Sequence, residues 1–141
     1  MTGANPVPQG DYVPATRHGD LIHTAGMTPR QAGQLLFTGP VHADAPLEDY
    51  HDAVVLACHN ALTAARAMLE PGETLTRVLS MTVYIATGPG FTAHSRVADF
   101  ASVFLRDELG ESGRSARAAI GVATLPGNAP VEIQLVAVAG L

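Results

Sequence analysis

The chain has 141 residues, of which 47% are hydrophobic and 15% are charged, and its formal net charge is -5. This length fits one domain that buries a sizeable core. All eight basic residues are arginines, so Schiff-base chemistry on a lysine, including that of pyridoxal phosphate, is excluded.

Three further classes of protein are disfavoured by the same sequence. The acidic balance without a basic run argues against a nucleic-acid partner. A single cysteine, Cys58, excludes an internal disulfide framework and suits the cytosol. Neither a signal-peptide pattern nor a run of about 18 apolar residues occurs. We therefore expect a soluble, cytoplasmic protein that does not bind a membrane.

The N-terminal half predicts short strands followed by one long helix. Residues 1–10 are rich in proline and glycine and are expected to be irregular. YVPATRHGDLIHTAG then predicts two strands around a turn at residues 18–20. A third short strand, QLLFTG, is expected at residues 34–39. The helix is expected over residues 44–70, because apolar residues recur at three- and four-residue spacing (Val54, Cys58, Leu62, Ala65 and Leu69).

The C-terminal half alternates strands with a second helix. RVLSMTVYIA at residues 77–86 predicts a strand, and residues 92–109 predict a helix that ends at a glycine. Strands at residues 116–122 and 131–139 follow, joined by the turn LPGNAP. The order β-β-β-α-β-α-β-β predicts one α+β domain over residues 1–141, with two helices on one face of a mixed sheet.

Two charged residues, Arg117 and Glu132, interrupt the otherwise small and apolar C-terminal strands. Because side chains alternate along a strand, Glu132 is expected on the helix-free face, together with Gln134, Val136 and Val138. Arg117 shares its own face with the small residues Ala119 and Gly121, which leave room for a ligand. A partly apolar sheet face with isolated charges predicts burial against another subunit, with a wet pocket at the seam.

The two charges allow two interpretations, and spacing alone does not decide between them. In the first, an Arg–Glu ion pair fixes a subunit interface. In the second, Arg117 holds a ligand carboxylate through two parallel N–H groups. Glu132, with a pKa raised by weakly polar surroundings, is then the acid, the base or the water-activating group.

Several separated blocks of the sequence match one known family. GDYVPATRHGDLIHTAGMTP is similar to the N-terminal hairpin of the RidA/YjgF imine deaminases. RAAIGVATLPGNAPVEIQ resembles their Arg-Ser…Leu-Pro…Glu-x-Glu block and keeps the spacing from Arg117 to Pro126 to Glu132. Within the family, the chorismate-mutase-like branch is most similar. Its stretches NYVPA, YTGKV, APGFT and GVASLP correspond to DYVPA, FTGPV, GPGFT and GVATLP here.

This resemblance implies a fold, an assembly and a reaction. It implies a chorismate-mutase-like fold, assembled as a homotrimer whose sheets form a central barrel with three clefts between subunits. Arg117 and the backbone N–H of Ala119 would bind the carboxylate of a 2-imino acid or its enamine, and Tyr12 would line the cleft. Glu132 would orient water for attack on the imine carbon, which yields a 2-keto acid and ammonia without a metal or organic cofactor.

The sequence also departs from the family pattern within the expected cleft. Ala25-Gly26-Met27 replaces the usual Ser-Gly-Gln, so a hydroxyl and an amide are missing. Ala118 and Ala119 replace a serine and a frequent cysteine, and Gln134 replaces the second glutamate. These changes predict a more apolar pocket, with Ala25 and Met27 among the residues that contact the substrate.

The histidines offer few alternatives to this site. His23 is expected to share a strand face with Ala25 and Met27, either as a structural residue or as a second proton carrier in the cleft. His51, Cys58 and His59 lie along one helix but do not bring three ligands to one face, so no metal site is expected.

The sequence therefore predicts hydrolytic deamination of reactive imines or enamines. Two alternatives remain open. One is a biosynthetic member that tautomerises or cyclises an imine or enamine without hydrolysis, and the other is a regulatory trimer that binds small carboxylates. An endoribonuclease label is attached to some members of the family, but the acidic, lysine-free chain argues against that activity here.

Overall fold

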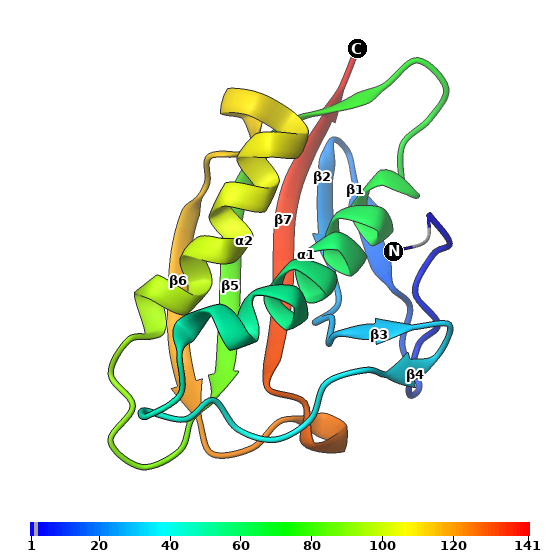
Figure 1. The fold of residues 1–141 in the computed structure, drawn as a ribbon. Coiled ribbons are helices and arrows are strands. Elements are labelled where there is room, and N and C mark those ends of the chain that lie inside the picture. Colours follow the sequence, from blue (N-terminus) through cyan, green and yellow to red (C-terminus); the bar gives the residue numbers. More distant parts are fainter. Residues whose placement is uncertain (2) are drawn as a thin grey trace.

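The main sheet has five strands, and both long helices cover one of its faces (Figure 1). The computed structural model describes residue 1 and residues 3–141. The strand order is β1-β2-β7-β5-β6, with only β5 and β6 parallel to each other. The predicted α+β sandwich is confirmed. Its elements are β1 (Ala15–His18), β2 (Leu21–Thr24), α1 (His51–Arg66), β5 (Thr74–Ala86), α2 (His94–Leu109), β6 (Ala116–Val122) and β7 (Val131–Gly140).

Two separate hairpins form the N-terminal part. β1 and β2 pair around the predicted turn, in which Gly19 has a φ of 60°. β3 (Arg30–Gln31) and β4 (Gln34–Leu35) pair only with each other. The strand expected over residues 34–39 is therefore shorter than predicted, covering only Gln34–Leu35, and it lies outside the main sheet. Ala32 and Gly33 both have a positive φ, 52° and 79°, so a tight two-residue turn folds the chain back at once.

The helices lie where the periodicity predicts them, with different ends. A 3-10 turn, η1 (Leu47–Tyr50), precedes α1, so the regular helix is shorter than the predicted range of 44–70. α2 ends as predicted at Leu109, where Gly110 takes a positive φ of 63°. Within the described part of the chain, no helix combines the length and the apolarity that crossing a bilayer requires.

The central strand β7 separates the two faces of the sheet. Its residues alternate strictly between buried and half-buried positions. The buried set packs under the helices and comprises Val131, Ile133, Leu135, Ala137 and Ala139. Glu132, Gln134, Val136 and Val138 lie on the helix-free face, as the period of two predicts.

The register between β2 and β7 shifts by one residue after Thr24. His23 pairs with Val136, whereas Met27 bridges to Ile133, so one extra residue is accommodated on the β2 side. The Thr24 hydroxyl fills the gap by accepting a hydrogen bond from the Leu135 N–H (3.0 Å). A one-residue shift moves a side chain to the other face. The prediction that His23 and Met27 share a face is therefore wrong, and Met27 is buried in the core.

A bidentate ion pair fastens β1 to the segment that leads into β5. Arg17 Nη1 and Nη2 donate to the two carboxylate oxygens of Glu73 at 2.6 and 2.9 Å. Nη1 also donates to the Met68 carbonyl at 3.0 Å, and Glu73 accepts from the Glu70 N–H at 2.7 Å. The guanidinium, followed by the backbone donor, lowers the pKa of Glu73 to about 2.

Candidate functional site

Arg117 lies on β6 with its side chain against α2. Its Nη1 donates to Asp99 Oδ1 at 2.8 Å and to Ser102 Oγ at 2.9 Å. Its Nη2 donates to the Ser95 hydroxyl at 2.7 Å and the Ser95 carbonyl at 3.2 Å. The four hydrogen bonds from the terminal nitrogens are thus all accepted by residues on one face of α2. The Nε–H group has no acceptor among the described residues. The guanidinium is oriented before any ligand arrives.

An open pocket adjoins this guanidinium. The floor of the pocket is formed by β6. Arg117, Ala119 and Gly121 lie on one side of this strand, and Ile120 also lines the pocket. The opposite wall comes from the start of α2 and the residues just before it, and consists of Thr92, His94 and Ser95. These three residues were missed by sequence reasoning, because only the β5–α2–β6 crossover brings the start of α2 beside the end of β6 (Figure 1).

Glu132 lies on the other face of the sheet, opposite Tyr84 of β5. Partial burial raises the pKa of its carboxyl group. The described residues offer it neither an ion pair nor a hydrogen bond. Nearby, the Tyr84 hydroxyl lies 3.4 Å from Gln134 Oε1. An unpaired, half-buried carboxyl group with a raised pKa has the properties of an acid/base catalyst.

Gly26 is a further residue that the sequence did not assign. A Cβ at this position would stand 2.7 Å from the Glu132 carboxyl carbon and would overlap with one of its oxygens. Only glycine leaves space for the carboxylate in its present position. The signal was present in the family block, where glycine is the unchanged member of Ala25-Gly26-Met27.

The other residues expected in the cleft are dispersed. Tyr12 is exposed and accepts a hydrogen bond from the Gln9 N–H (3.0 Å). Tyr12, Gly26 and Met27 line a separate cavity of about 220 Å³ between residues 4–9, the β3–β4 hairpin and α1. His23 is exposed on the helix-free face and Ala25 is half-buried beside the core.

Arg117 and Glu132 do not meet within one chain. Arg117 pairs in register with Met81, a buried residue of the helix-covered face, whereas Glu132 pairs with Tyr84 on the opposite face. The carboxylate that Arg117 contacts is that of Asp99, which is itself 61% exposed. An Arg117–Glu132 pair inside the chain is therefore excluded, and a site that uses both groups must draw them from two copies.

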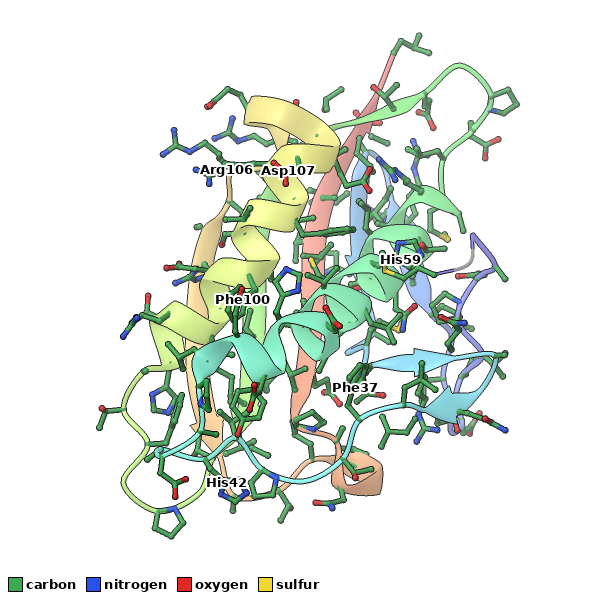
Figure 2. The ribbon with its side chains drawn as sticks, in the orientation of Figure 1. Phe37, His42, His59, Phe100, Arg106 and Asp107 are labelled. Atoms are coloured by element: carbon green, nitrogen blue, oxygen red, sulfur yellow. The ribbon has the colours of Figure 1, made fainter. Side chains whose placement is uncertain are left out.

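The three residues that the sequence offered as possible metal ligands, His51, Cys58 and His59, all lie on α1 away from the Arg117 pocket. The rings of His51 and Phe100, and those of His59 and Phe104, meet in T-shaped contacts between α1 and α2. Figure 2 labels His59 and Phe100. Cys58 is buried, and desolvation raises the pKa of its thiol. Residues 1 and 3–141 contain no cluster of three or more His, Cys, Asp or Glu residues positioned to hold a metal ion.

This α+β sandwich, with Arg117 against α2 and Glu132 on the helix-free face, is similar to one known family over nearly the whole chain. The family model described as endoribonuclease L-PSP matches residues 2–139. The chain therefore belongs to the endoribonuclease L-PSP family, also called the RidA/YjgF family.

Three relatives illustrate this relation. The chain is 31% identical over 127 residues to protein TCP17 of Trypanosoma cruzi, covering 89% of this chain and 79% of that protein. Atu1372 of Agrobacterium tumefaciens, whose function is unknown, is 34% identical with a TM-score of 0.86, over 96% and 87% of the two chains. The YjgF gene product of E. coli shares the fold, with a TM-score of 0.66 at 20% identity over 97% and 94%.

Proposed function

We propose that this protein hydrolyses reactive 2-imino acids, or their enamines, to 2-keto acids and ammonia in clefts between subunits. The observation that carries the proposal is that the two functional groups lie on opposite faces of the sheet. An oriented guanidinium lies on one face of the sheet, and an unpaired carboxyl group with a raised pKa lies on the other. Two copies in contact would supply both groups to one ligand.

In this reaction, the substrate carboxylate displaces the exposed Asp99 carboxylate from Arg117 and is bound by the guanidinium. The Ala119 backbone N–H on the pocket floor assists it. A protonated imine carbon is already electrophilic, so no metal or organic cofactor is required. Glu132 takes a proton from water while the water oxygen bonds to the imine carbon. The proton then passes to the nitrogen of the tetrahedral intermediate. Glu132 accepts the proton of the new hydroxyl group as the C–N bond breaks, and ammonia leaves while the keto group forms.

The proposed assembly is a homotrimer. On the helix-free face, Leu21, Leu79 and Ile120 are 41%, 40% and 41% exposed, although they are large and apolar. β6 is an edge strand, whose free backbone groups invite another chain. Closed cyclic assembly would cover both features. Light scattering at micromolar concentration should then give about three times 14.6 kDa, and a stable monomer would contradict the shared cleft.

A non-hydrolytic reaction uses the same groups. The Glu132 carboxylate can exchange a proton with an enamine carbon as well as with water, because no neighbouring donor occupies it within the described residues. Tautomerisation or cyclisation of a pathway intermediate is therefore the second candidate function. In either case we place the protein in the cytoplasm, with a small imine, enamine or keto acid as its ligand.

One assay separates the candidates. An amino acid oxidase generates imino acids in two parallel samples. Without semicarbazide, the rate of ammonia release reports hydrolysis. With semicarbazide, which displaces ammonia from an imine faster than it condenses with a keto acid, the rate of semicarbazone formation reports the imine that escapes the enzyme. The proposed enzyme should accelerate ammonia release and reduce the rate of semicarbazone formation. If the protein binds keto acids but leaves ammonia release unchanged, the hydrolytic reaction is wrong and the second candidate function is favoured.

A further inference from the structure

His94 forms the far end of the Arg117 pocket, and its position is tightly determined. It is the first residue of α2, and α2 begins beside the C-terminal end of β6 (Figure 1). The His94 ring meets the ring of Phe91 edge-on, at 5.1 Å between centroids and 69° between planes. On its other side it lies over Gly121, where a Cβ would overlap with Nε2 and stand 3.1 Å from Cδ2. The strand thus leaves space for this imidazole only because residue 121 is glycine.

The guanidinium and this imidazole are anchored next to each other. Ser95, which follows His94 directly, accepts both hydrogen bonds from Arg117 Nη2. Between Arg117 and His94, the side of β6 that faces α2 carries only the methyl group of Ala119 and the backbone of Gly121, because Ile120 pairs with Tyr84 and its side chain lies on the opposite face. A short carboxylic acid held by Arg117 can therefore extend along this floor until its far end reaches the imidazole.

That far end is polar and lacks an acceptor. Neither ring nitrogen of His94 has a hydrogen-bond partner within the described residues. The Thr92 hydroxyl lines the same pocket, and Thr87 Oγ1 lies 3.4 Å from the Cβ position of Gly121. The lining includes no aspartate or glutamate, and Asp99, which pairs with Arg117 at 2.8 Å, borders a neighbouring hollow. The donors at the two ends of the pocket complement a ligand whose carboxylate replaces Asp99 and whose far end carries a second acceptor.

We propose that His94 determines specificity in the Arg117 pocket by selecting carboxylic acids whose side chain carries a second hydrogen-bond acceptor. The inference rests on the proposed function only in that Arg117 holds the ligand's carboxylate. It revises the apolar pocket that Ala25, Met27 and Ala119 suggest, because the polar wall comes from α2. A ligand with an apolar side chain leaves the half-buried imidazole without an acceptor, so the site favours a ligand that supplies one.

Calorimetric titration with keto acids tests the inference without catalysis. The probes are α-ketoglutarate, its terminal amide, and an isostere in which an isopropyl group replaces the second carboxyl group. Wild type should bind the two acceptor-bearing ligands about tenfold more tightly than the isostere, as expected for the net contribution of one hydrogen bond. The His94→Leu variant should lose this preference by weakening only the acceptor-bearing ligands, and His94→Gln should retain part of it.

The controls keep each outcome informative. His18→Leu changes an exposed histidine of β1 outside the pocket and should preserve the wild-type preference. Pyruvate, whose side chain is a single methyl group, reports anchoring by Arg117 alone. Pyruvate binding without any preference among the longer ligands would overturn the role of His94 and leave the proposed function standing. Loss of all binding in wild type would overturn both. Equal weakening of every ligand in His94→Leu would indicate a structural role and would also overturn the inference.

Discussion

The two faces of the sheet carry functional groups that differ in their hydrogen bonding. On the helix-covered face, Arg117 has its four terminal N–H groups satisfied by α2 and is only 17% exposed. On the helix-free face, Glu132 has no partner within the described chain, and burial alone shifts its pKa upward. One group is oriented by its own chain, whereas the other remains to be completed by a ligand, by water or by another copy.

This difference follows from the topology. A β5–α2–β6 crossover places a helix directly over β6, so polar residues one and two turns apart on α2 can converge on a single side chain. On the opposite face no described helix lies over the sheet, and the Gly26 backbone is close to the Glu132 carboxyl group. If Arg117 and Glu132 have the proposed roles, binding and proton transfer should respond to different substitutions.

The largest expected effect comes from Glu132→Gln. This substitution keeps shape and removes the base, so the rate of ammonia release should fall by roughly 10²–10⁴. Keto-acid affinity should change little, because Arg117 is untouched. Stopped assays and calorimetry on the same preparation measure both quantities. An active Glu132→Gln protein would end the catalytic assignment, and joint loss of trimer and binding would favour an interface ion pair.

Arg117→Lys should act on the other half of the site. Lysine keeps the charge but lacks the planar fork that reaches Ser95, Asp99 and Ser102 together. We expect keto-acid binding to weaken by about 1.5–3 kcal/mol, the range for a charged hydrogen bond. The matched control is Arg96→Lys, an exposed arginine on the same helix. A variant that binds normally but turns over slowly would show that the two halves are not separable.

Gly26→Ala tests whether the position of Glu132 matters as well as its charge. The added methyl group must displace the carboxylate, whose carbon would be 2.7 Å away. The rate should fall about tenfold through misplacement, with keto-acid affinity unchanged. In the Glu132→Gln background the same substitution should have little further effect on rate, since neighbouring groups that act together are not additive. Equal effects in both backgrounds would assign Gly26 a purely structural role.

The sequence predicted local features well and long-range ones poorly. Alternation along β7 correctly assigned Glu132 to the open face, and helical periodicity located α1 and α2. The face of Met27 was wrong, because the register shift after Thr24 depends on a hydrogen bond to Leu135, more than a hundred residues away. His94 was missed for the same reason. Its importance depends on Gly121, which a crossover brings near and which no local pattern pairs with it.

The smallest expected effect concerns the pH dependence of stability, which should differ in sign between two glutamates. Arg17 lowers the pKa of Glu73 to about 2, so its stabilising contribution is complete above the unfolded value of 4.5 and is lost as pH falls toward 2. Burial raises the pKa of Glu132, so the folded state binds that proton more tightly than the unfolded chain does. Its contribution is complete below 4.5 and is lost as pH rises through the folded pKa.

Melting temperatures of wild type, Glu73→Gln and Glu132→Gln across this range measure both contributions. The deficit of Glu73→Gln should shrink as pH is lowered from 4.5 toward 2, because wild type then loses the same ion pair. The melting temperature of Glu132→Gln should rise relative to that of wild type as pH rises above 4.5, because the variant places no charge at this half-buried position. If the melting temperatures of Glu132→Gln and wild type change in parallel with pH, a partner group stabilises the charge of Glu132 in solution. The contrast between the satisfied guanidinium and the bare carboxylate would then not hold.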